Sequence, residues 1–177
     1  RDHVAARALP GVTVALTDYR DVQGTFDGVA SIEMVEAVGP EFWSAYLATI
    51  ARVLKPGGRA ALQFITIADD IWDAYAGSVD FIQRYVFPGG SLISERRFRA
   101  LAERHGLSWQ DRRALGMDYA ETLARWRDAF DAAVADGRPP ARFDARFQGL
   151  WRYYLMYCEG GFRGGGIDVV QVTLVRE

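Results

Sequence analysis

Several chemically distinctive residue types are scarce in this sequence of 177 residues. Lysine occurs once, at Lys55, and 21 Lys and Arg against 23 Asp and Glu give a net charge of −2. This balance excludes a nucleic-acid-binding protein that works through a broad basic surface, because neutralising phosphates requires clustered cations. Cysteine also occurs once, at Cys158, which excludes an internal disulfide framework and a multi-cysteine metal site. A lone cysteine fits a reducing compartment, so we expect a cytoplasmic protein.

Long hydrophobic runs are absent as well. No apolar run of about 18 residues and no signal-peptide pattern occurs, so we expect no membrane-spanning segment. With 50% hydrophobic and 25% charged residues, the chain has the composition of one globular domain, residues 1–177, with a substantial core. The sequence opens on Arg1, and residues 4–9 resemble the end of a helix that runs into a turn. We therefore expect the chain to start within a larger unit.

Apolar, β-branched segments in the first part of the chain alternate with an amphipathic one. Strands are predicted over residues 12–16, 28–32 and 60–67. A helix is predicted to begin at Pro40 and to end at Lys55, with Phe42, Tyr46 and Ile50 on one face. The strand over residues 28–32 is apolar throughout, as expected for a parallel strand that is covered on both faces. This order of elements predicts an α/β fold.

The segment over residues 69–92 departs from this alternation. It is rich in aromatic residues, closes with Pro88-Gly89-Gly90, and is too long for a plain connection. We expect it to be a lid-like helical insertion that lines an apolar pocket.

The rest of the chain returns to helices and strands. Helices are predicted from Ser94 to His105, from Asp118 to Gly137 and over residues 143–162, and strands over residues 107–115 and 167–175. Ser94 and Asp118 are the predicted N-caps. In the last helix, Trp151, Tyr154 and Cys158 share an apolar face, which is typical of core positions.

Acidic residues follow two of the predicted strands. Asp18 comes after residues 12–16, and Glu33 and Glu36 come after residues 28–32. Open α/β sheets bind ligands at the carboxyl ends of their strands, so these acids are candidates for cofactor contact or proton transfer. Two alternatives stand beside this interpretation: Asp18 as a turn residue, and Glu36 as an acid at the start of a helix, favoured by the helix dipole.

Five stretches of the sequence form a combined signature. They are Asp18–Arg20, SIEMVEAVG at residues 31–39, LKPGGRAALQFITI at residues 54–67, FIQRYVFPGG at residues 81–90, and WRYYLMYCEGGFRGGGIDVVQ at residues 151–171. LKPGG alone is common to many methyltransferases. In this order and spacing, the combination resembles the S-adenosylmethionine-dependent methyltransferases of the cyclopropane-fatty-acyl-phospholipid synthase family, over nearly the whole chain.

The resemblance implies a Rossmann-like class I methyltransferase sheet with helices on both faces. The first two strands of that sheet, and the glycine-rich loop that cradles the cofactor, would precede Arg1. In the family these two strands lie between the third strand, here residues 12–16, and the fourth, here residues 28–32. We therefore expect either a fragment of a larger enzyme or a chain that rearranges or swaps to cover its exposed edges.

The resemblance also implies the chemistry. A double bond of a lipid acyl chain attacks the sulfonium methyl group, and the resulting carbocation loses a proton to a bound bicarbonate and closes to a cyclopropane. Aromatic faces would stabilise the cation. The implied catalytic residues are Glu36, Ile65 and Tyr119, with Gln63 where the common pattern has His. By its pattern alone, Tyr119 is the first aromatic residue on an amphipathic helix, a position more typical of core.

The implied cofactor contacts lie at the ends of two strands. Asp18 would accept from the adenine amino group, the Tyr19 ring would pack beside the adenine, and backbone groups of Ser31 and Ile32 would line the cofactor. The resemblance implies no metal. S-adenosylmethionine is the expected cofactor, with bicarbonate as a second bound species.

Three functional hypotheses follow. The first is a C-methyltransferase that makes cyclopropane rings in unsaturated phospholipid acyl chains, at the inner face of a membrane to which it binds peripherally. The second is a methyltransferase that methyl-branches a fatty acyl chain or modifies a small molecule, and the third is a non-catalytic lipid-binding or interaction module. The expected partners are phospholipid acyl chains and, in a homo-oligomer, further copies of the chain, but no nucleic acid.

Overall fold

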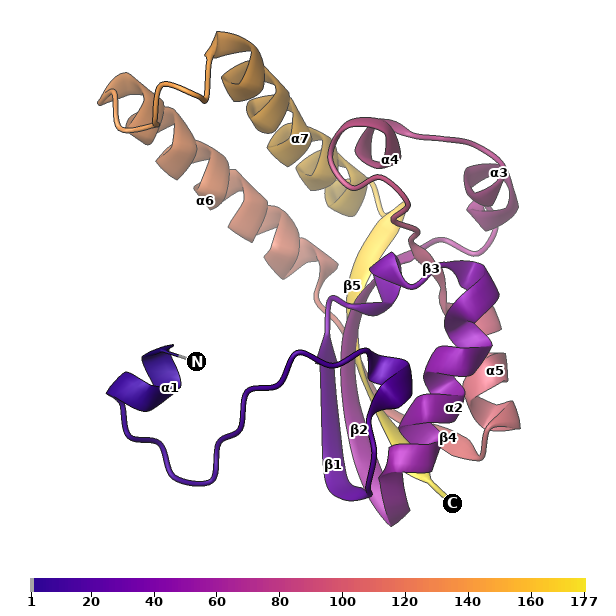
Figure 1. Cartoon of the computed structure of the whole chain (residues 1–177). Coiled ribbons are helices and arrows are strands. Elements are labelled where there is room, and N and C mark those ends of the chain that lie inside the picture. The colour runs from indigo at the N-terminus through magenta and orange to yellow at the C-terminus, as the bar shows by residue number, and fades with distance from the viewer. Residues whose placement is uncertain (1) are drawn as a thin grey trace.

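A mixed five-stranded sheet is the centre of the molecule in the computed structural model, which describes residues 2–177 (Figure 1). The strands follow the order β1-β2-β5-β4, and the short β3 pairs with β2. Their bounds are β1 Phe26–Ile32, β2 Leu54–Ile67, β3 Ile93–Ser94, β4 Leu107–Ala114 and β5 Ile167–Arg176. β1 and β3 run parallel to β2, whereas β5 is antiparallel to both β2 and β4. The structure thus confirms the α/β class and the strands predicted over residues 28–32, 60–67, 107–115 and 167–175.

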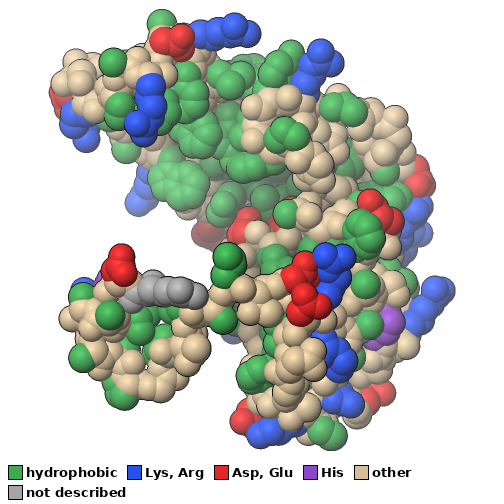
Figure 2. Space-filling model, viewed as in Figure 1, with side chains coloured by type: hydrophobic (Ala, Val, Ile, Leu, Met, Phe, Trp, Pro, Cys, Tyr) green, Lys and Arg blue, Asp and Glu red, His purple; other side chains and the backbone are tan. Residues whose placement is uncertain are grey.

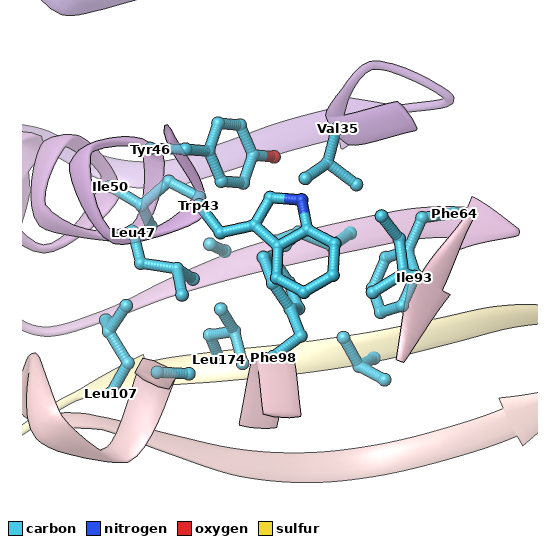
Figure 3. Close-up of a cluster of buried hydrophobic side chains, with 14 of the residues drawn as sticks. Val35, Trp43, Tyr46, Leu47, Ile50, Phe64, Ile93, Phe98, Leu107 and Leu174 are labelled. Carbon is cyan, nitrogen blue, oxygen red and sulfur yellow. The ribbon is translucent and has the colours of Figure 1, made fainter. Parts of the chain in front are cut away.

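Two helices cover one face of the sheet: α2, Trp43–Val53, and α5, Glu95–Arg104 (Figure 1). Between them and the strands lies the first hydrophobic cluster, in which Trp43 is 2% exposed and Phe98 is fully buried (Figure 3). The ring of Phe98 lies 5.7 Å from that of Trp43 and 5.4 Å from that of Phe64. Tyr46 points into this cluster as predicted, but Phe42 is 47% exposed, because it lies in the 3-10 turn Pro40–Phe42 ahead of α2.

Ser94 caps α5 as its sequence predicts. Its hydroxyl accepts from the backbone N–H of Arg97 at 3.3 Å, which satisfies one of the free donors at the helix start. The second predicted cap is wrong, because α6 begins at Gly116 and Asp118 lies inside its first turn. Gly116 N–H instead donates to the side chain of Asp168 at 2.7 Å.

The helices α6, Gly116–Ala135, and α7, Ala145–Arg163, form a hairpin that projects from the other face of the sheet (Figure 1). Its base forms the second hydrophobic cluster, in which Leu123, Leu155 and Phe162 pack with Ile65 and Val169 of the strands. Helices therefore lie on both faces, as predicted. The hairpin covers only one end of its face, however, and the rest of that face carries exposed residues.

The insertion between β2 and β3 contains two short helices, α3, Trp72–Ala76, and α4, Phe81–Tyr85. Aromatic contacts tie it to the hairpin, because the ring of Phe81 lies 4.7 Å from that of Tyr153 and 5.5 Å from that of Tyr157. The insertion is thus helical and aromatic-rich as predicted, and it lies against α7.

The strand predicted over residues 12–16 is wrong. After α1, Asp2–Ala6, the chain runs without a strand up to the 3-10 turn Tyr19–Asp21, and Leu16 is fully exposed. The β-branched pattern is genuine, but a strand also needs a partner for its backbone, and no strand within residues 2–177 pairs with this segment.

β1 is also less buried than predicted. It pairs only with β2 within the described part of the chain, and Phe26 and Ile32 are 43% and 57% exposed. Apolar residues on both faces indicated a covered strand, but here the strand lies at the edge of the sheet, with part of one face open.

Candidate functional site

The carboxyl ends of β1 and β2 lie side by side, because the two strands are parallel and Ile32 is in register with Gln63. The chain leaves β1 at Glu33, whose φ of 52° is in the left-handed region that non-glycine residues rarely adopt. Its backbone N–H donates to the carbonyl of Gln63 at 2.9 Å. This turn directs the next residues across the end of β2, which is where the candidate site begins.

Glu36 lies in the short turn Val35–Ala37 beyond β1. Its Oε1 accepts from the backbone N–H of Ile65 at 2.6 Å, so its side chain is held on β2. Its Oε2 is buried and has no hydrogen-bond partner within residues 2–177. Burial raises the pKa of this carboxyl group, and the Ile65 N–H opposes part of that rise. Glu36 is therefore a half-buried acid whose buried Oε2 can take a ligand or a proton, as far as the described residues show.

Gln63 is held by hydrogen bonds at both ends of its amide. Gln171 Nε2 donates to Gln63 Oε1 at 2.8 Å, and Gln63 Nε2 donates to Glu33 Oε1 at 2.9 Å. The cross-strand pairing of Gln63 with Gln171 on β5 explains the first contact. The amide is thus oriented with its N–H group toward Glu33, and nothing in the sequence pattern pointed to Gln171 or Glu33 as its partners.

Tyr119 reaches the same region from α6. Its half-buried ring packs at 5.2 Å against Phe162 and shares the second hydrophobic cluster with Ile65. Burial raises the pKa of its hydroxyl, and the negative charges of Glu33 and Glu36 contribute to the rise. The structure therefore places all four predicted catalytic residues, Glu36, Gln63, Ile65 and Tyr119, around one end of β2.

Three of the predicted cofactor residues gather at the end of β1. The ring of Tyr19 packs edge-on at 5.7 Å against that of Tyr46, and the Tyr46 hydroxyl donates to Ser31 Oγ at 2.7 Å. Ile32 follows with an exposed side chain. Tyr46 was predicted only as a core residue, yet it joins Tyr19 to Ser31.

Asp18 is engaged in its own turn. It caps the 3-10 turn Tyr19–Asp21, and its carboxylate accepts from the Arg20 backbone N–H at 2.9 Å and from the Arg20 guanidinium at 2.7 Å. These bonds lower the pKa of Asp18 to about 2. The turn-residue interpretation describes these contacts, while a role toward adenine stays a prediction.

An aromatic track runs along one side of α7. Adjacent rings are separated by 4.5 Å for Phe143 and Phe147, 6.0 Å for Phe147 and Trp151, and 5.0 Å for Trp151 and Tyr154. Phe87 of the insertion then meets Tyr154 at 6.1 Å. Figure 2 shows hydrophobic side chains gathered over α6 and α7 around a hollow on this side of the molecule. Helical spacing marked these residues as core, but several of them form an open wall.

Cys158 lies beyond this track on α7. Burial raises the pKa of its thiol to about 12, so the thiol is protonated at neutral pH and is a poor nucleophile. Burial and the nearby Cys158 also raise the pKa of Tyr154. No group of three or more His, Cys, Asp or Glu residues able to hold a metal ion occurs within residues 2–177.

Comparison with known proteins agrees with this arrangement. A family model described as mycolic acid cyclopropane synthetase matches residues 2–172. The chain belongs to this family. The predicted resemblance to the cyclopropane-fatty-acyl-phospholipid synthases is thereby confirmed, and with it the class I methyltransferase fold.

Two curated relatives are well matched. Tuberculostearic acid methyltransferase UfaA1 of Mycobacterium tuberculosis is 42% identical over 179 residues, which is 100% of this chain and 42% of that protein. Cyclopropane-fatty-acyl-phospholipid synthase of Escherichia coli is 37% identical over 169 residues, 93% of this chain and 41% of that protein. The chain therefore spans less than half the length of these relatives.

Solved structures of the same family share the fold. Mycolic acid cyclopropane synthase CmaA1, in a complex with SAH and CTAB, is 26% identical with a TM-score of 0.84, over 99% of this chain and 66% of that chain. The cyclopropane synthase MmaA2 from Mycobacterium tuberculosis has a TM-score of 0.82 at 23% identity, over 99% of this chain and 66% of that chain. The likeness extends over the sheet, the insertion and the hairpin, because nearly all of this chain is covered.

Among the helices of residues 2–177, none combines the length and the apolar character that a membrane span requires.

Proposed function

We propose that this chain forms part of the catalytic domain of an S-adenosylmethionine-dependent C-methyltransferase that acts on unsaturated acyl chains of phospholipids. One observation carries the proposal. The Oε2 of Glu36, which is buried and has no hydrogen-bond partner among the described residues, lies where the ends of β1 and β2 meet the aromatic residues of the hairpin. An enzyme that alkylates a lipid double bond needs both a polar group for a proton and an apolar wall that excludes water.

The residues at the end of β1 fit the adenosine part of the cofactor. Tyr19, Ser31 and Ile32 lie together through the Tyr46 contacts and would hold it there. An ionised carboxylate has about four acceptor sites, so Asp18 retains acceptor capacity beyond its bonds with Arg20. When bound, S-adenosylmethionine supplies an electrophilic methyl group to a carbon nucleophile.

Glu36 and Tyr119 are the groups that would donate hydrogen bonds to the proton acceptor. The raised pKa of Glu36 favours a proton on its Oε2, and the raised pKa of Tyr119 keeps its hydroxyl neutral as a donor. These two groups would hold bicarbonate, which supplies a base when bound. Gln63 contributes less directly, because its amide is already bonded to Glu33 and Gln171.

The aromatic track provides the apolar part of the site. Half-buried rings of Trp151 and Tyr154 present faces that attract a developing cation, and they exclude water that would otherwise capture it. We propose that the acyl chain lies along this track and that the protein takes it from a membrane surface to which it binds peripherally.

Calorimetry with S-adenosylmethionine and its demethylated product tests the proposal on protein expressed from the full gene. We expect both compounds to bind, and we expect Tyr19→Ala to weaken binding while Tyr85→Ala, on the exposed side of α4, leaves it unchanged. Absence of binding by the wild-type protein would contradict the methyltransferase and would favour a lipid-binding module.

A methyl-branching activity is the second candidate. Two observations favour it: the 42% identical relative is named a tuberculostearic acid methyltransferase, and Gln63 replaces the His of the pattern described above. Mass spectrometry and proton NMR of phospholipids from cells expressing the full gene separate the two products. A cyclopropane adds one CH2 and consumes the double bond, whereas a methylene branch adds one CH2 and keeps an alkene.

A further inference from the structure

The segment Gly90–Leu92, where the insertion returns to the sheet, touches the candidate site through its backbone. Ser91 N–H donates to the backbone carbonyl of Glu36 at 2.8 Å. Two residues later the chain enters β3, which pairs with β2 at Thr66 and Ile67, just beyond Ile65. Glu36 is thus held on two sides: its side chain by β2, and its backbone by this returning segment.

A tight turn delivers the segment to that position. Gly90 N–H donates to the carbonyl of Phe87 at 3.0 Å, and Gly89 has a φ of 83°. Proline followed by a residue with positive φ is typical of a type II turn, and only glycine adopts that φ without cost. A Cβ on Gly90 would lie 3.1 Å from the Phe87 carbonyl oxygen. The turn therefore leaves the segment little room to shift.

The hydroxyl of Tyr75 on α3 is the acceptor that holds this segment. It accepts from the Leu92 backbone N–H at 3.0 Å and from Gln83 Nε2 at 3.4 Å. Gln83 Nε2 also donates to the Gly90 carbonyl at 3.0 Å, and Gln83 is itself fixed by a reciprocal capping box with Asp80. The two side chains therefore bond to the residues on either side of Ser91.

The Tyr75 hydroxyl is suited to this role by its surroundings. Tyr75 is half-buried, and burial raises the pKa of its hydroxyl, so the hydroxyl is neutral at neutral pH. Without it, the Leu92 N–H would lose its acceptor in a partly buried place. A buried donor left without a partner destabilises the conformation that contains it.

We infer that Tyr75 is a positioning residue for Glu36. Tyr75 and Gln83 hold Gly90 and Leu92, and Ser91 between them bonds to the backbone carbonyl of Glu36. We call this set of contacts the brace. On this account the insertion is more than a cover over the acyl chain. Any movement of α3 and α4 that breaks the brace releases the backbone of Glu36 and admits water to its carboxyl group. The inference rests on Glu36 being the functional carboxyl proposed above. Its test, however, measures the titration of Glu36 itself and needs no cofactor.

The test is Tyr75→Phe, which removes only the hydroxyl. Tyr85→Phe is the matched control, because Tyr85 lies in the same insertion and its exposed ring contacts Arg84 and Phe81 rather than the returning segment. The readout is the titration of the Glu36 carboxyl carbon by NMR, assigned by its disappearance in Glu36→Gln. The charged and titratable groups near Glu36, which are Glu33, Tyr46 and Tyr119, are the same in all of these variants.

In Tyr75→Phe we expect the pKa of Glu36 to fall toward the ordinary range of a carboxyl group, because water reaches it. We also expect hydrogen exchange at the Ser91 amide to become roughly tenfold faster, since the neighbouring Leu92 N–H loses its acceptor and Gln83 loses one of its two. Tyr85→Phe should change neither. A Tyr75→Phe protein that is less stable but keeps the wild-type Glu36 titration would overturn the inference, because the residue would then be merely structural.

Gln83→Met provides a second variant should Tyr75→Phe fail to fold. It removes the bonds of the Gln83 side chain to the Gly90 carbonyl, the Tyr75 hydroxyl and the Asp80 N–H, while leaving the Tyr75 contact with Leu92 in place. We expect a smaller shift of the Glu36 pKa in the same direction. A folded Gln83→Met protein with unchanged Glu36 titration and unchanged Ser91 exchange would also overturn the inference. A lack of catalytic activity in the whole enzyme would not change the conclusion drawn from the Glu36 titration or from the Ser91 exchange.

Discussion

The two hydrophobic clusters are built from the same kinds of residue but serve different ends. In the first, under α2 and α5, Phe98 and Phe64 are fully buried and Trp43 is 2% exposed. In the second, at the base of α6 and α7, Leu155 and Phe162 are 2% and 3% exposed, but the aromatic residues packed against them, Tyr119, Trp151 and Tyr154, are only half-buried. A closed aromatic cluster stabilises the fold, whereas an open one leaves ring faces free for a ligand. Glu36 lies at the boundary between the two clusters. Substitutions in each cluster and at Glu36 therefore test whether the two clusters differ.

The largest expected effect is on the closed cluster. Phe98→Ala should lower the free energy of unfolding by about 3–5 kcal/mol, because it leaves a cavity among Trp43, Phe64 and Trp109. Trp126→Ala, at an exposed ring on α6 beside Tyr119 of the open cluster, should cost under about 1 kcal/mol. Urea denaturation of both variants checks this. Similar losses for the two would remove the distinction between the clusters.

The second prediction concerns Glu36, at the boundary between the two clusters. Burial raises the pKa of Glu36 in the folded protein above the ordinary value of a glutamate carboxyl group. The folded state therefore holds a proton that the unfolded state has lost, and stability should fall as pH rises from the unfolded to the folded pKa. Glu36→Gln should remove this decline.

Glu159→Gln is the control with the opposite sign. Arg163 and Arg127 lower the pKa of Glu159, so its contribution is present above the unfolded pKa and is lost as pH falls. The test is the free energy of unfolding of the wild type, Glu36→Gln and Glu159→Gln, measured as a function of pH across the titration of both carboxyl groups. A wild-type decline that persists in Glu36→Gln would show that another group causes it.

The third prediction tests how the closed cluster supports the cofactor residues. Tyr46→Phe removes the hydrogen bond to Ser31 and should cost about 1 kcal/mol of stability. Burial raises the pKa of Tyr46 to about 12, so the loss should be constant through the neutral range. Thermal unfolding at several pH values provides the check, and a loss that varied with neutral pH would argue against a neutral hydroxyl.

The smallest effect is expected in the segment that leads into the fold. Leu16 is fully exposed, so Leu16→Ser should change stability by less than about 0.5 kcal/mol. Leu47→Ala is the control, since Leu47 is fully buried on α2 and should cost about 2–5 kcal/mol. A large effect at Leu16 would mean that residues 12–16 are packed in solution.

Local patterns predicted most of the elements because their physical causes are local. The Ser94 cap followed from a side chain that reaches its own helix start, and β2 and β5 followed from apolar, β-branched runs. The same reasoning failed over residues 12–16 and overestimated the burial of β1. Alternation reveals which residues a strand would bury, but it does not reveal whether a partner strand is present.

The candidate site was predictable only in part. Family motifs brought Glu36, Gln63, Ile65 and Tyr119 to attention, and the structure places them around one end of β2. The partners that orient them were not visible, because Gln171 and Ser91 act through contacts 108 residues away in sequence or through the backbone alone. Whether the aromatic face of a helix is buried in the core or lines an open site depends on what covers it. The spacing of residues in the sequence does not reveal this.

The role of Glu36 is the central claim, and lipid analysis of cells expressing the full gene tests it most directly. Mass spectrometry would compare phospholipid acyl chains made by the wild type, by Glu36→Gln and by Glu41→Gln, whose carboxyl lies at an exposed position in the next turn. We expect the gain of one CH2 in the wild type and in Glu41→Gln, and its loss in Glu36→Gln at equal protein levels. Acyl chains modified as fully by Glu36→Gln as by the wild type would contradict the account.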